Sequence, residues 1–319
     1  MRRVTARPHP ARTRAAPVVA IFSDDPGWHG ARLCAALAER GWVGRYVSLQ
    51  TCHFDLSAGG PGLHLPGFDA LPDAAFVRGV PGGTLEEVVY YLDVLHALRR
   101  LGVLVYNDGG AIERSVDKGM TSFLLHTAGV PTPPAWVVRD PDEAGRVLAR
   151  ELAAGHELVL KPLFGSQGEG LTRLNGKDHA TLPRPVGSGI HYLQRFIPGD
   201  TAQAQDFRVF VIGARAVAAM RRSAPTGWIT NVAQGASCHP ADLTPDLRDL
   251  AEAAARTLEM AYAGVDILRD TAGRAWVIEV NGVPAWKGLQ QVCGFDLAAA
   301  LVADLLRLQR GAPRMEAVG

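Results

Sequence analysis

The stretch GVDILRDTAGRAWVIEVN, residues 264–281, has the pattern of two apolar strands joined by a tight turn. The turn DTAG ends in glycine, which is typical of an antiparallel hairpin. If the turn is centred between its threonine and alanine, Asp266 lies opposite Val277, and Glu279 is the diagonal neighbour on the same face at about 7–8 Å. Asn281 follows Glu279 by two residues and stays on that face of an extended strand. The hairpin therefore predicts that two carboxylates and one amide converge.

Oxygen donors of this kind suit Mg²⁺, which also keeps phosphate and water ligands. Glu279 lies in the apolar run AWVIEV, where an unpaired buried carboxylate would cost several kcal/mol. A metal ion would remove that cost. The alternative is an ordinary alternating strand with Glu279 facing solvent. Because Asp266 and Asn281 are predicted on the same face, we interpret the set as a metal site.

A second pattern is a lysine in an apolar strand followed by a glycine-rich loop. Lys161 lies in LVLKPL, and the loop GSQGEG spans residues 165–170. Backbone N–H groups of such a loop can close over phosphates, although the sequence is not a P-loop. A plain hairpin turn is the alternative, and Lys161 favours phosphate binding. The candidate loop residues are Gly165, Ser166, Gln167, Gly168 and Gly170.

Lysine is rare in this chain, with four lysines against 29 arginines. Each lysine is therefore more strongly expected to be needed as a compact ammonium group. Lys118 lies near the start of a helix predicted from about Ser115 to Ala128, where a cation is unfavourable unless an anion compensates it. The alternative is an exposed surface lysine.

Asp206 and Arg208 alternate on one predicted strand and so share a face. The acid could accept a ribose hydroxyl, and the arginine could bind phosphate or carboxylate oxygens with two hydrogen bonds. The alternative is that they form structural ion pairs with other residues. Upstream, the segment QRFI is interpreted as a connection between lobes that offers backbone groups to a base. Its residues are Gln194, Arg195, Phe196 and Ile197.

Composition limits the other classes of function. The 319 residues carry a net charge of +1, so no overall field favours nucleic acid or an anionic membrane. No apolar run approaches the about 18 residues of a membrane span. The four cysteines form no CxxC pair, which predicts reduced thiols in a cytoplasmic protein. Residues 1–17 hold five arginines and no acid and are predicted to be a disordered basic extension, and residues 311–319 a flexible tail.

The chain opens with a strand–helix–strand pattern between Val18 and Leu49, which predicts an open, parallel α/β sheet. The loop after the first strand lacks GxGxxG, so a dinucleotide site is not supported. This lobe is predicted to close near Tyr106.

Taken in order, the motifs DK, LVLKPLFGSQGEG, QRFI, DFR, GVDIL and IEVN resemble the ATP-grasp fold, and most closely the RimK-type amino-acid ligases. The resemblance covers about residues 107–310. It implies an α/β protein in which two α+β lobes, at about 107–195 and 196–310, grip ATP. An α/β pre-ATP-grasp domain would precede them at residues 18–106.

The resemblance implies a role for each candidate residue. Lys118 and Lys161 would contact the ATP phosphates beneath the glycine loop, QRFI would offer its backbone to adenine, and Asp206 would contact the nucleotide. Two Mg²⁺ ions, with Mn²⁺ as a substitute, would be held by Asp266, Glu279 and Asn281. The γ-phosphate or an acyl phosphate would face Arg208, Arg221 and Asn231.

The implied chemistry is carboxylate–amine ligation. A substrate carboxylate attacks the γ-phosphate, and an amine then displaces phosphate from the acyl phosphate to leave an amide. The alternatives are an accessory protein that binds Mg-ATP without turnover, and an enzyme that phosphorylates a small molecule. The complete Asp–Glu–Asn set favours the ligase. Members of this family often assemble, so a homo-oligomer is also considered.

Two stretches bear on the acceptor. Where ribosomal-protein-modifying members have Arg-Ser-Asn, this chain has Ile229-Thr230-Asn231, which argues against glutamylation of a protein tail. Instead, RGVPGG at residues 78–83 and NGVPAWKG at residues 281–288 resemble a branch linked to tetrahydromethanopterin, which adds glutamate to a pterin cofactor. We therefore expect a small-molecule acceptor and glutamate or a similar amino acid. Trp286 and Lys287 could meet that acceptor; the alternative is a capping aromatic and a surface lysine.

Overall fold

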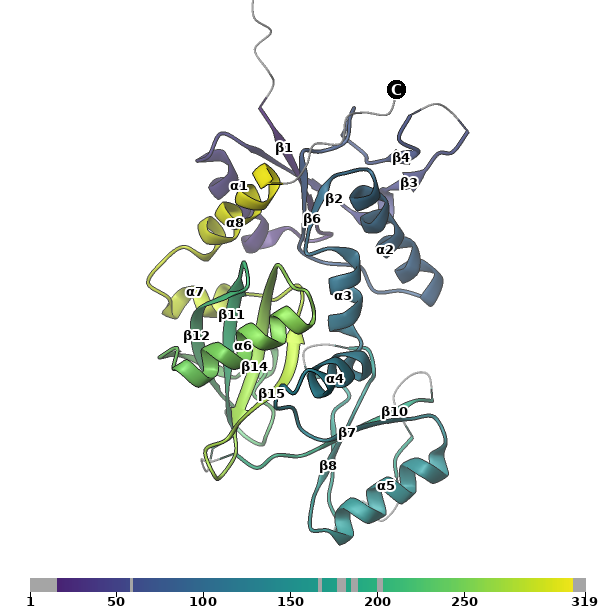
Figure 1. Cartoon of the computed structure of the whole chain (residues 1–319), viewed down its shortest axis with the longest axis vertical. Helices are drawn as coiled ribbons and strands as arrows, with labels where there is room; N and C mark the ends of the chain where they lie inside the picture. The colour runs from purple at the N-terminus through teal and green to yellow at the C-terminus, as the bar shows by residue number, and fades with distance from the viewer. Residues whose placement is uncertain are drawn as a thin grey trace, which may run out of the picture.

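The computed structural model describes residues 16–57, 60–165, 168–176, 182–184, 189–199 and 203–311. The predicted basic extension and flexible tail lie almost entirely outside these ranges. Figure 1 shows an N-terminal lobe at the top, a central antiparallel sheet below it and a smaller sheet at the bottom.

The N-terminal lobe is built on a parallel sheet with strand order β2-β1-β5-β6. As predicted, it begins with a strand–helix–strand unit. Helix α2 begins with a capping box, because the side chains of Thr84 and Glu87 accept hydrogen bonds from each other's backbone N–H groups. The elements of this lobe are β1 (Val18–Phe22), α1 (Gly27–Ala38), β2 (Val43–Val47), η1 (Leu49–Thr51), β3 (His53–Phe54), β4 (Leu63–His64), β5 (Ala74–Val77), α2 (Leu85–Arg100) and β6 (Leu104–Tyr106).

The small sheet has the antiparallel order β7-β10-β8-β9 and is covered by α5 through a compact apolar cluster. The helix predicted from Ser115 to Ala128 begins later, at Lys118, and a separate helix that was not predicted, α3, ends just before it. Asp117 has extended backbone angles, ends the first helix and caps the second with its side chain, so Lys118 is the first residue of α4. The elements are α3 (Gly109–Val116), α4 (Lys118–Thr127), β7 (Ala135–Val138), α5 (Pro141–Ala153), β8 (Leu158–Lys161), β9 (Thr172–Leu174) and β10 (His191–Arg195).

The central sheet has the antiparallel order β13-β12-β11-β14-β15. Helix α6 packs against one face, while α7 contacts β12 and β13. The last helix, α8, returns to the N-terminal lobe and packs on α1. The elements are β11 (Gln205–Ile212), β12 (Arg215–Ser223), η2 (Val232–Gln234), β13 (Ser237–Ala241), α6 (Pro245–Thr257), β14 (Tyr262–Arg269), β15 (Ala275–Asn281), α7 (Lys287–Val292) and α8 (Leu297–Gly311).

The β14–β15 hairpin forms as predicted, but its register differs. The pairing shifts between Asp266 and Ile267, so that Ile267 pairs with Val277 while Asp266 pairs directly with Glu279. The prediction that Asp266 lies opposite Val277 is therefore wrong, because the irregularity inserts one residue into β15. The two carboxylates are direct cross-strand neighbours instead of diagonal ones.

Asn107 joins the N-terminal lobe to the hairpin strands. Its buried amide donates to the carbonyls of Tyr262 (2.7 Å) and Gly282 (2.6 Å), and its Oδ1 accepts from the N–H of Ala261 (2.7 Å). A buried amide bonded on both sides fixes the geometry of the segments that it joins. The link holds both strands of the hairpin against the end of β6.

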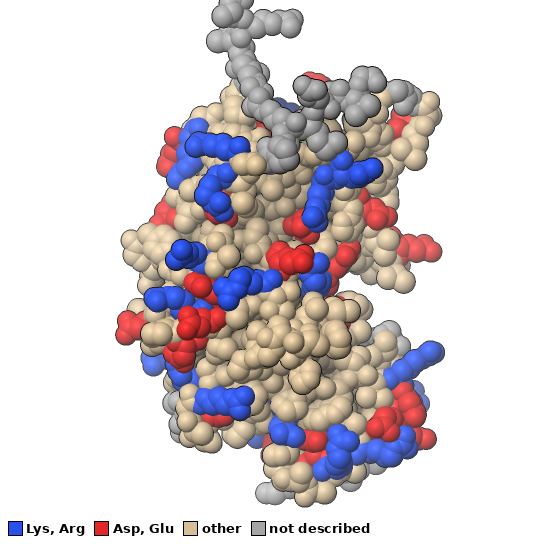
Figure 2. Space-filling model, viewed as in Figure 1, with Lys and Arg blue, Asp and Glu red and all other residues tan. Residues whose placement is uncertain are grey.

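Surface charge is mixed. Figure 2 shows basic and acidic side chains interspersed over the face drawn. Among the described residues, no helix is both long enough and apolar enough to cross a membrane.

Candidate active site

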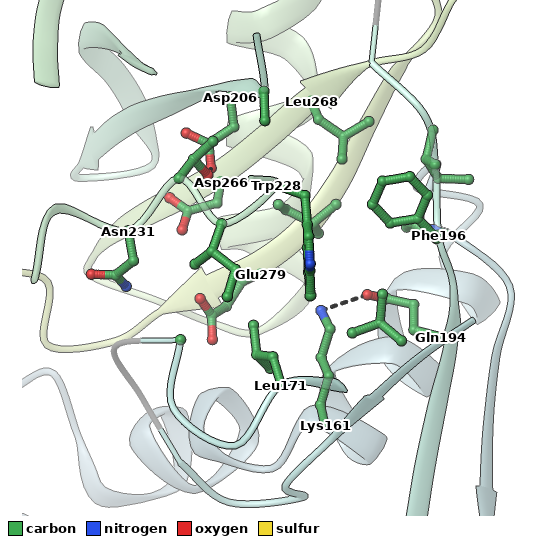
Figure 3. A pocket seen from close by; sticks show the side chains of 18 of the residues that line it. Lys161, Leu171, Gln194, Phe196, Asp206, Trp228, Asn231, Asp266, Leu268 and Glu279 are labelled. Atoms are coloured by element: carbon green, nitrogen blue, oxygen red, sulfur yellow. Dashed lines mark hydrogen bonds between the residues drawn. The ribbon is translucent and has the colours of Figure 1, made fainter. Parts of the chain in front are cut away.

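A cleft of about 1140 Å³, counting the solvent at its mouth, lies between the small sheet and the central sheet. Figure 3 shows that it has a lysine on the side of the small sheet and carboxylates on the side of the central sheet. The predicted residues that line it are Lys118, Lys161, Gly165, Gly168, Gln194, Arg195, Phe196, Ile197, Asp206, Asn231, Asp266 and Glu279.

The lysines form the cationic wall. Lys161, the last residue of β8, donates from Nζ to Gln194 Oε1 at 2.7 Å, and Lys118 donates from Nζ to the carbonyl of Gly165 at 2.6 Å. Burial lowers the pKa of Lys161 to about 8, although the Glu279 and Asp266 carboxylates oppose the shift. Burial also lowers the pKa of Lys118. Desolvated ammonium groups that face a cleft are well suited to bind an anion.

The carboxylate wall is organised by two arginines. Arg208 binds Asp266 with both ends of its guanidinium, Nε–Oδ1 and Nη2–Oδ2 each being 2.7 Å. Arg222 lies 2.9 Å from Asp266 and donates from Nε to Asp206 Oδ1 at 2.7 Å. Burial raises the pKa of Asp266, but Arg208 and Arg222 outweigh this and hold that pKa below its usual range. These four side chains form one buried ionic network.

Asp206 is 2% exposed, and its second oxygen accepts from Thr230 Oγ1 at 2.6 Å. Burial raises its pKa, partly opposed by Arg222. Arg222 and Thr230 together give Asp206 three hydrogen bonds, which leaves one acceptor position on a carboxylate that also lines the cleft. Both Asp206 and Arg208 form structural ion pairs, as the alternative interpretation has it, while contact of Asp206 with the nucleotide stays a prediction. Arg208 does not line the cleft.

The structure does not bring Arg221 to the site. On β12 it pairs with Phe207 and is exposed, whereas Arg222 pairs with Asp206 and faces the cleft. Consecutive strand residues point to opposite faces, so only one of the two arginines can reach the site. Arg222 was missed by the sequence analysis. Antiparallel pairing places Arg222 across from Asp206, but the register that shows this comes from the structure and not from the sequence.

The metal-ligand set is only partly assembled. Among the described residues, Glu279 forms no hydrogen bond or ion pair, and it lines the cleft directly opposite Asp266. Within the same residues, no three His, Cys, Asp or Glu side chains gather into a metal site. Asn281 lies on the same face, but it donates to the carbonyl of Gly264 at 3.3 Å and does not line the cleft. Two carboxylates with phosphate and water oxygens match the donors that Mg²⁺ takes beside a nucleotide, so the residues fit that ion.

The far end of the cleft is apolar. Phe196 and Trp228 meet edge to face at 5.9 Å, and Leu171 and Leu268 complete the walls (Figure 3). Trp228 was not predicted. A flat apolar space of this kind suits a base. The N–H groups of Arg195 and Phe196 already bond the carbonyls of Pro134 and Glu157, so these residues could offer a base only their carbonyl oxygens.

The glycine loop lies only partly within the described residues, which exclude Ser166 and Gln167. Gly168 has φ +74°, and a Cβ there would lie 2.9 Å from Gln234 and 3.0 Å from Ile229. Its carbonyl accepts from Gln234 Nε2 at 2.9 Å, which ties the loop to the segment that follows β12. Gly170 lies outside the lining. Asn231 lines the cleft and uses its side-chain oxygen to cap η2.

Two α+β lobes that enclose a cleft with lysines on one wall and carboxylates on the other define an ATP-grasp ligase, a class that binds ATP and Mg²⁺. The chain belongs to the RimK-like ATP-grasp family, whose domain model matches residues 115–305.

Named relatives agree with this. The chain is 33% identical over 237 residues to a tetrahydromethanopterin:alpha-L-glutamate ligase of Methanococcus maripaludis, covering 73% of this chain and 78% of that protein. It is 29% identical to the protein of the same name from Methanosarcina acetivorans, and the match covers 89% of this chain and 97% of that protein. It is 32% identical to a probable alpha-L-glutamate ligase of Nitrosococcus oceani, and the match covers 85% of this chain and 89% of that protein.

Solved structures share the fold. The ATP-grasp ligase PsnB in complex with a minimal precursor has a TM-score of 0.71 and 21% identity, covering 92% of this chain and 99% of that one. D-cycloserine synthetase DcsG has a TM-score of 0.66 and 19% identity, and the match covers 91% of this chain and 99% of that one.

Proposed function

We propose that this ligase joins glutamate, or a similar amino acid, to a small-molecule acceptor of the tetrahydromethanopterin type at the expense of ATP. The names of the relatives support the amino acid and the acceptor. The observation that carries the proposal is the position of Lys161 across the cleft from the paired carboxylates Asp266 and Glu279. This arrangement holds a polyphosphate between cations on one wall and metal-binding oxygens on the other.

Each side chain has a proposed task. Lys118 and Lys161 bind phosphate oxygens, and the glycine loop covers them. Phe196, Trp228 and Leu268 enclose the base. Asp266 and Glu279 would hold Mg²⁺, which would supply positive charge beside the phosphate oxygens; two ions, and Mn²⁺ in their place, belong to this proposal. Asn281 completes the set if its side chain turns from Gly264.

The reaction proceeds in two steps. An acceptor carboxylate oxygen attacks the γ-phosphorus and ADP leaves, which gives an acyl phosphate. The amino group of glutamate then attacks the acyl carbon, phosphate leaves, and the nitrogen loses a proton to form the amide. Arg222 and Arg208 hold Asp266 in place, and Asn231 lies at the cleft wall where the transferred phosphoryl group would pass. Catalysis consists mainly of positioning and charge neutralisation.

ADP formation by the purified chain with Mg-ATP, glutamate and tetrahydromethanopterin tests the proposal. We expect ADP release that requires both substrates, together with a mass gain of one glutamate residue on the pterin. Omission of the pterin is the first control, and Glu279→Gln is the second. ADP release without any mass gain on the pterin would contradict the proposed acceptor.

A further inference from the structure

The segment that follows the hairpin lies over the face of the sheet that carries the ionic network. A Cβ on Gly264 would lie 2.9 Å from Pro284 Cβ and 3.6 Å from Arg208 Cδ, so Pro284 lies next to the arginine that holds Asp266. A Cβ on Gly288 would lie 2.9 Å from the sulfur of Cys238, which pairs with Arg222. Residues 282–288 therefore lie close to the ionic network, on the side of the N-terminal lobe, although they are not among the residues that line the cleft.

Two N-terminal-lobe residues hold this segment. Arg78 donates from Nη1 to the carbonyls of Pro284 (3.1 Å) and Val283 (3.4 Å), and its guanidinium lies 4.8 Å from the ring centre of Trp286. His29 accepts from the N–H of Trp286 through Nε2 at 3.1 Å, with the two ring centres 4.6 Å apart. Trp286 itself is fully buried among residues of α1 and α8.

Basic groups gather here without an acid. Lys287 follows Trp286 and is exposed, and Arg78 is half-buried. His29 and Arg78 both contact Trp286, and Lys287 is the next residue along the chain. Burial, then Arg78 and then Lys287 lower the pKa of His29, together to about 4. Among the described residues, no acidic side chain forms an ion pair with Arg78 or Lys287. By contrast, Arg195, Arg208 and Arg222 all bind carboxylates.

Like charges held together without a counter-ion raise the free energy of the folded chain unless an anion binds to them. The alternative is that Arg78 serves only to hold residues 283–286 and that Lys287 is a solvated surface lysine. Arg78 uses Nη1 for the two carbonyls, and its guanidinium also interacts with the Tyr262 hydroxyl, so Lys287 is the more accessible of the two cations. Lysine is also rare in this chain, and two of the other three lysines line the cleft.

We propose that Arg78 and Lys287 form an anion site that binds a non-reacting carboxylate of one of the two substrates, beside the reaction centre. This inference rests on the proposed ligase function. Both glutamate and a carboxylate-bearing acceptor carry such a group, and charge-assisted hydrogen bonds from an arginine and a lysine would recognise it. The site would fix the substrate between the N-terminal lobe and the hairpin strands.

Lys287→Gln is the variant that tests the site, because Arg78 also holds the loop. The matched control is Arg248→Gln, since Arg248 is an exposed cation on α6, on the opposite face of the sheet. The first measurement is calorimetric titration of glutarate into the full-length protein saturated with Mg-AMPPNP. Glutarate carries carboxylates but no amine, and AMPPNP fills the phosphate positions. We expect Lys287→Gln to weaken glutarate binding about tenfold and Arg248→Gln to leave it unchanged.

The second measurement is steady-state kinetics with separate KM values for ATP, glutamate and the pterin. A raised KM for glutamate alone assigns the carboxylate to the amino acid, and a raised KM for the pterin alone assigns it to the acceptor. The KM for ATP should not change. The proposed anion site would be overturned by any of three results. These are no glutarate binding to the unmodified chain, equal glutarate binding to the unmodified chain and both variants, and unchanged KM values of Lys287→Gln for both glutamate and the pterin. If the unmodified chain turns over the substrates while Lys287→Gln behaves like it, the ligase proposal stands and only the anion site fails.

Discussion

Arg208 and Asp266 are direct cross-strand neighbours on β11 and β14, and their side chains form a bidentate ion pair with both N–O distances at 2.7 Å. The pair orients a carboxylate that faces the cleft. Arg222 approaches the same carboxylate from β12 at 2.9 Å. The arginines of this sheet therefore hold the acid in place, while Glu279 opposite remains without a partner among the described residues.

Arg222→Gln should destabilise the protein by about 3 kcal/mol, because it leaves Asp206 and Asp266 buried with too little positive charge. Arg221→Gln is the matched control: the neighbouring arginine is exposed and should change the free energy of unfolding by less than about 0.5 kcal/mol. Urea denaturation of both variants measures the difference. Equal losses from the two substitutions would show that the network does not contribute as described.

Glu279→Gln should lower substrate-dependent ADP formation about 100-fold or more, because an amide removes the charge that the metal ion needs. The fold should survive, since the carboxylate has no hydrogen-bond partner among the described residues. Asp249→Asn, an exposed acid on α6, serves as the control and should keep full activity. Activity of Glu279→Gln within threefold of the unmodified protein would rule out Glu279 as a metal ligand.

ATP affinity should fall as pH rises from 7.5 to 9.5. The pKa of Lys161 in the free protein is lowered to about 8, so this lysine is largely neutral above that pH. Bound phosphate favours the charged form, so binding above pH 8 must take up a proton, and Kd should rise up to about tenfold per pH unit. Lys161→Arg keeps its charge throughout and should show a flatter profile. Parallel pH profiles of the two proteins in a titration with Mg-AMPPNP would refute the role of Lys161.

Stability should depend on His29 between pH 6.5 and 4. Burial, Arg78 and Lys287 lower the pKa of His29 to about 4, so in this range the unfolded chain binds a proton that the folded chain does not. Stability is therefore retained above pH 6.5 and lost as pH falls toward 4, by about 1 kcal/mol after allowance for solvent screening. His29→Gln should show a smaller loss over this range in urea denaturation. His126→Gln, an exposed histidine, should follow the unmodified protein, and a His29→Gln curve that also follows it would exclude this coupling.

The local patterns were sufficient for the elements that carry the site. The turn DTAG between two apolar runs predicted the β14–β15 hairpin, and Lys161 at the end of an apolar run predicted the strand that leads into the glycine loop. Asp117 shows the limit of such patterns. Its side chain caps α4, so that this helix begins at Lys118 instead of Ser115 and a separate helix, α3, ends at Val116, which periodicity alone does not reveal.

The sequence by itself determined the α/β class, the hairpin with its two carboxylates, and the lysines that face them, because strand alternation and turn chemistry act over a few residues. Only the tertiary structure decided that Asp266 pairs directly with Glu279 and that Arg222, not Arg221, enters the site. Both outcomes depend on strand register, and a shift of one residue exchanges the two faces of a strand. Register is set by packing between segments far apart in the chain, such as the apolar cluster that joins α6 to the central sheet.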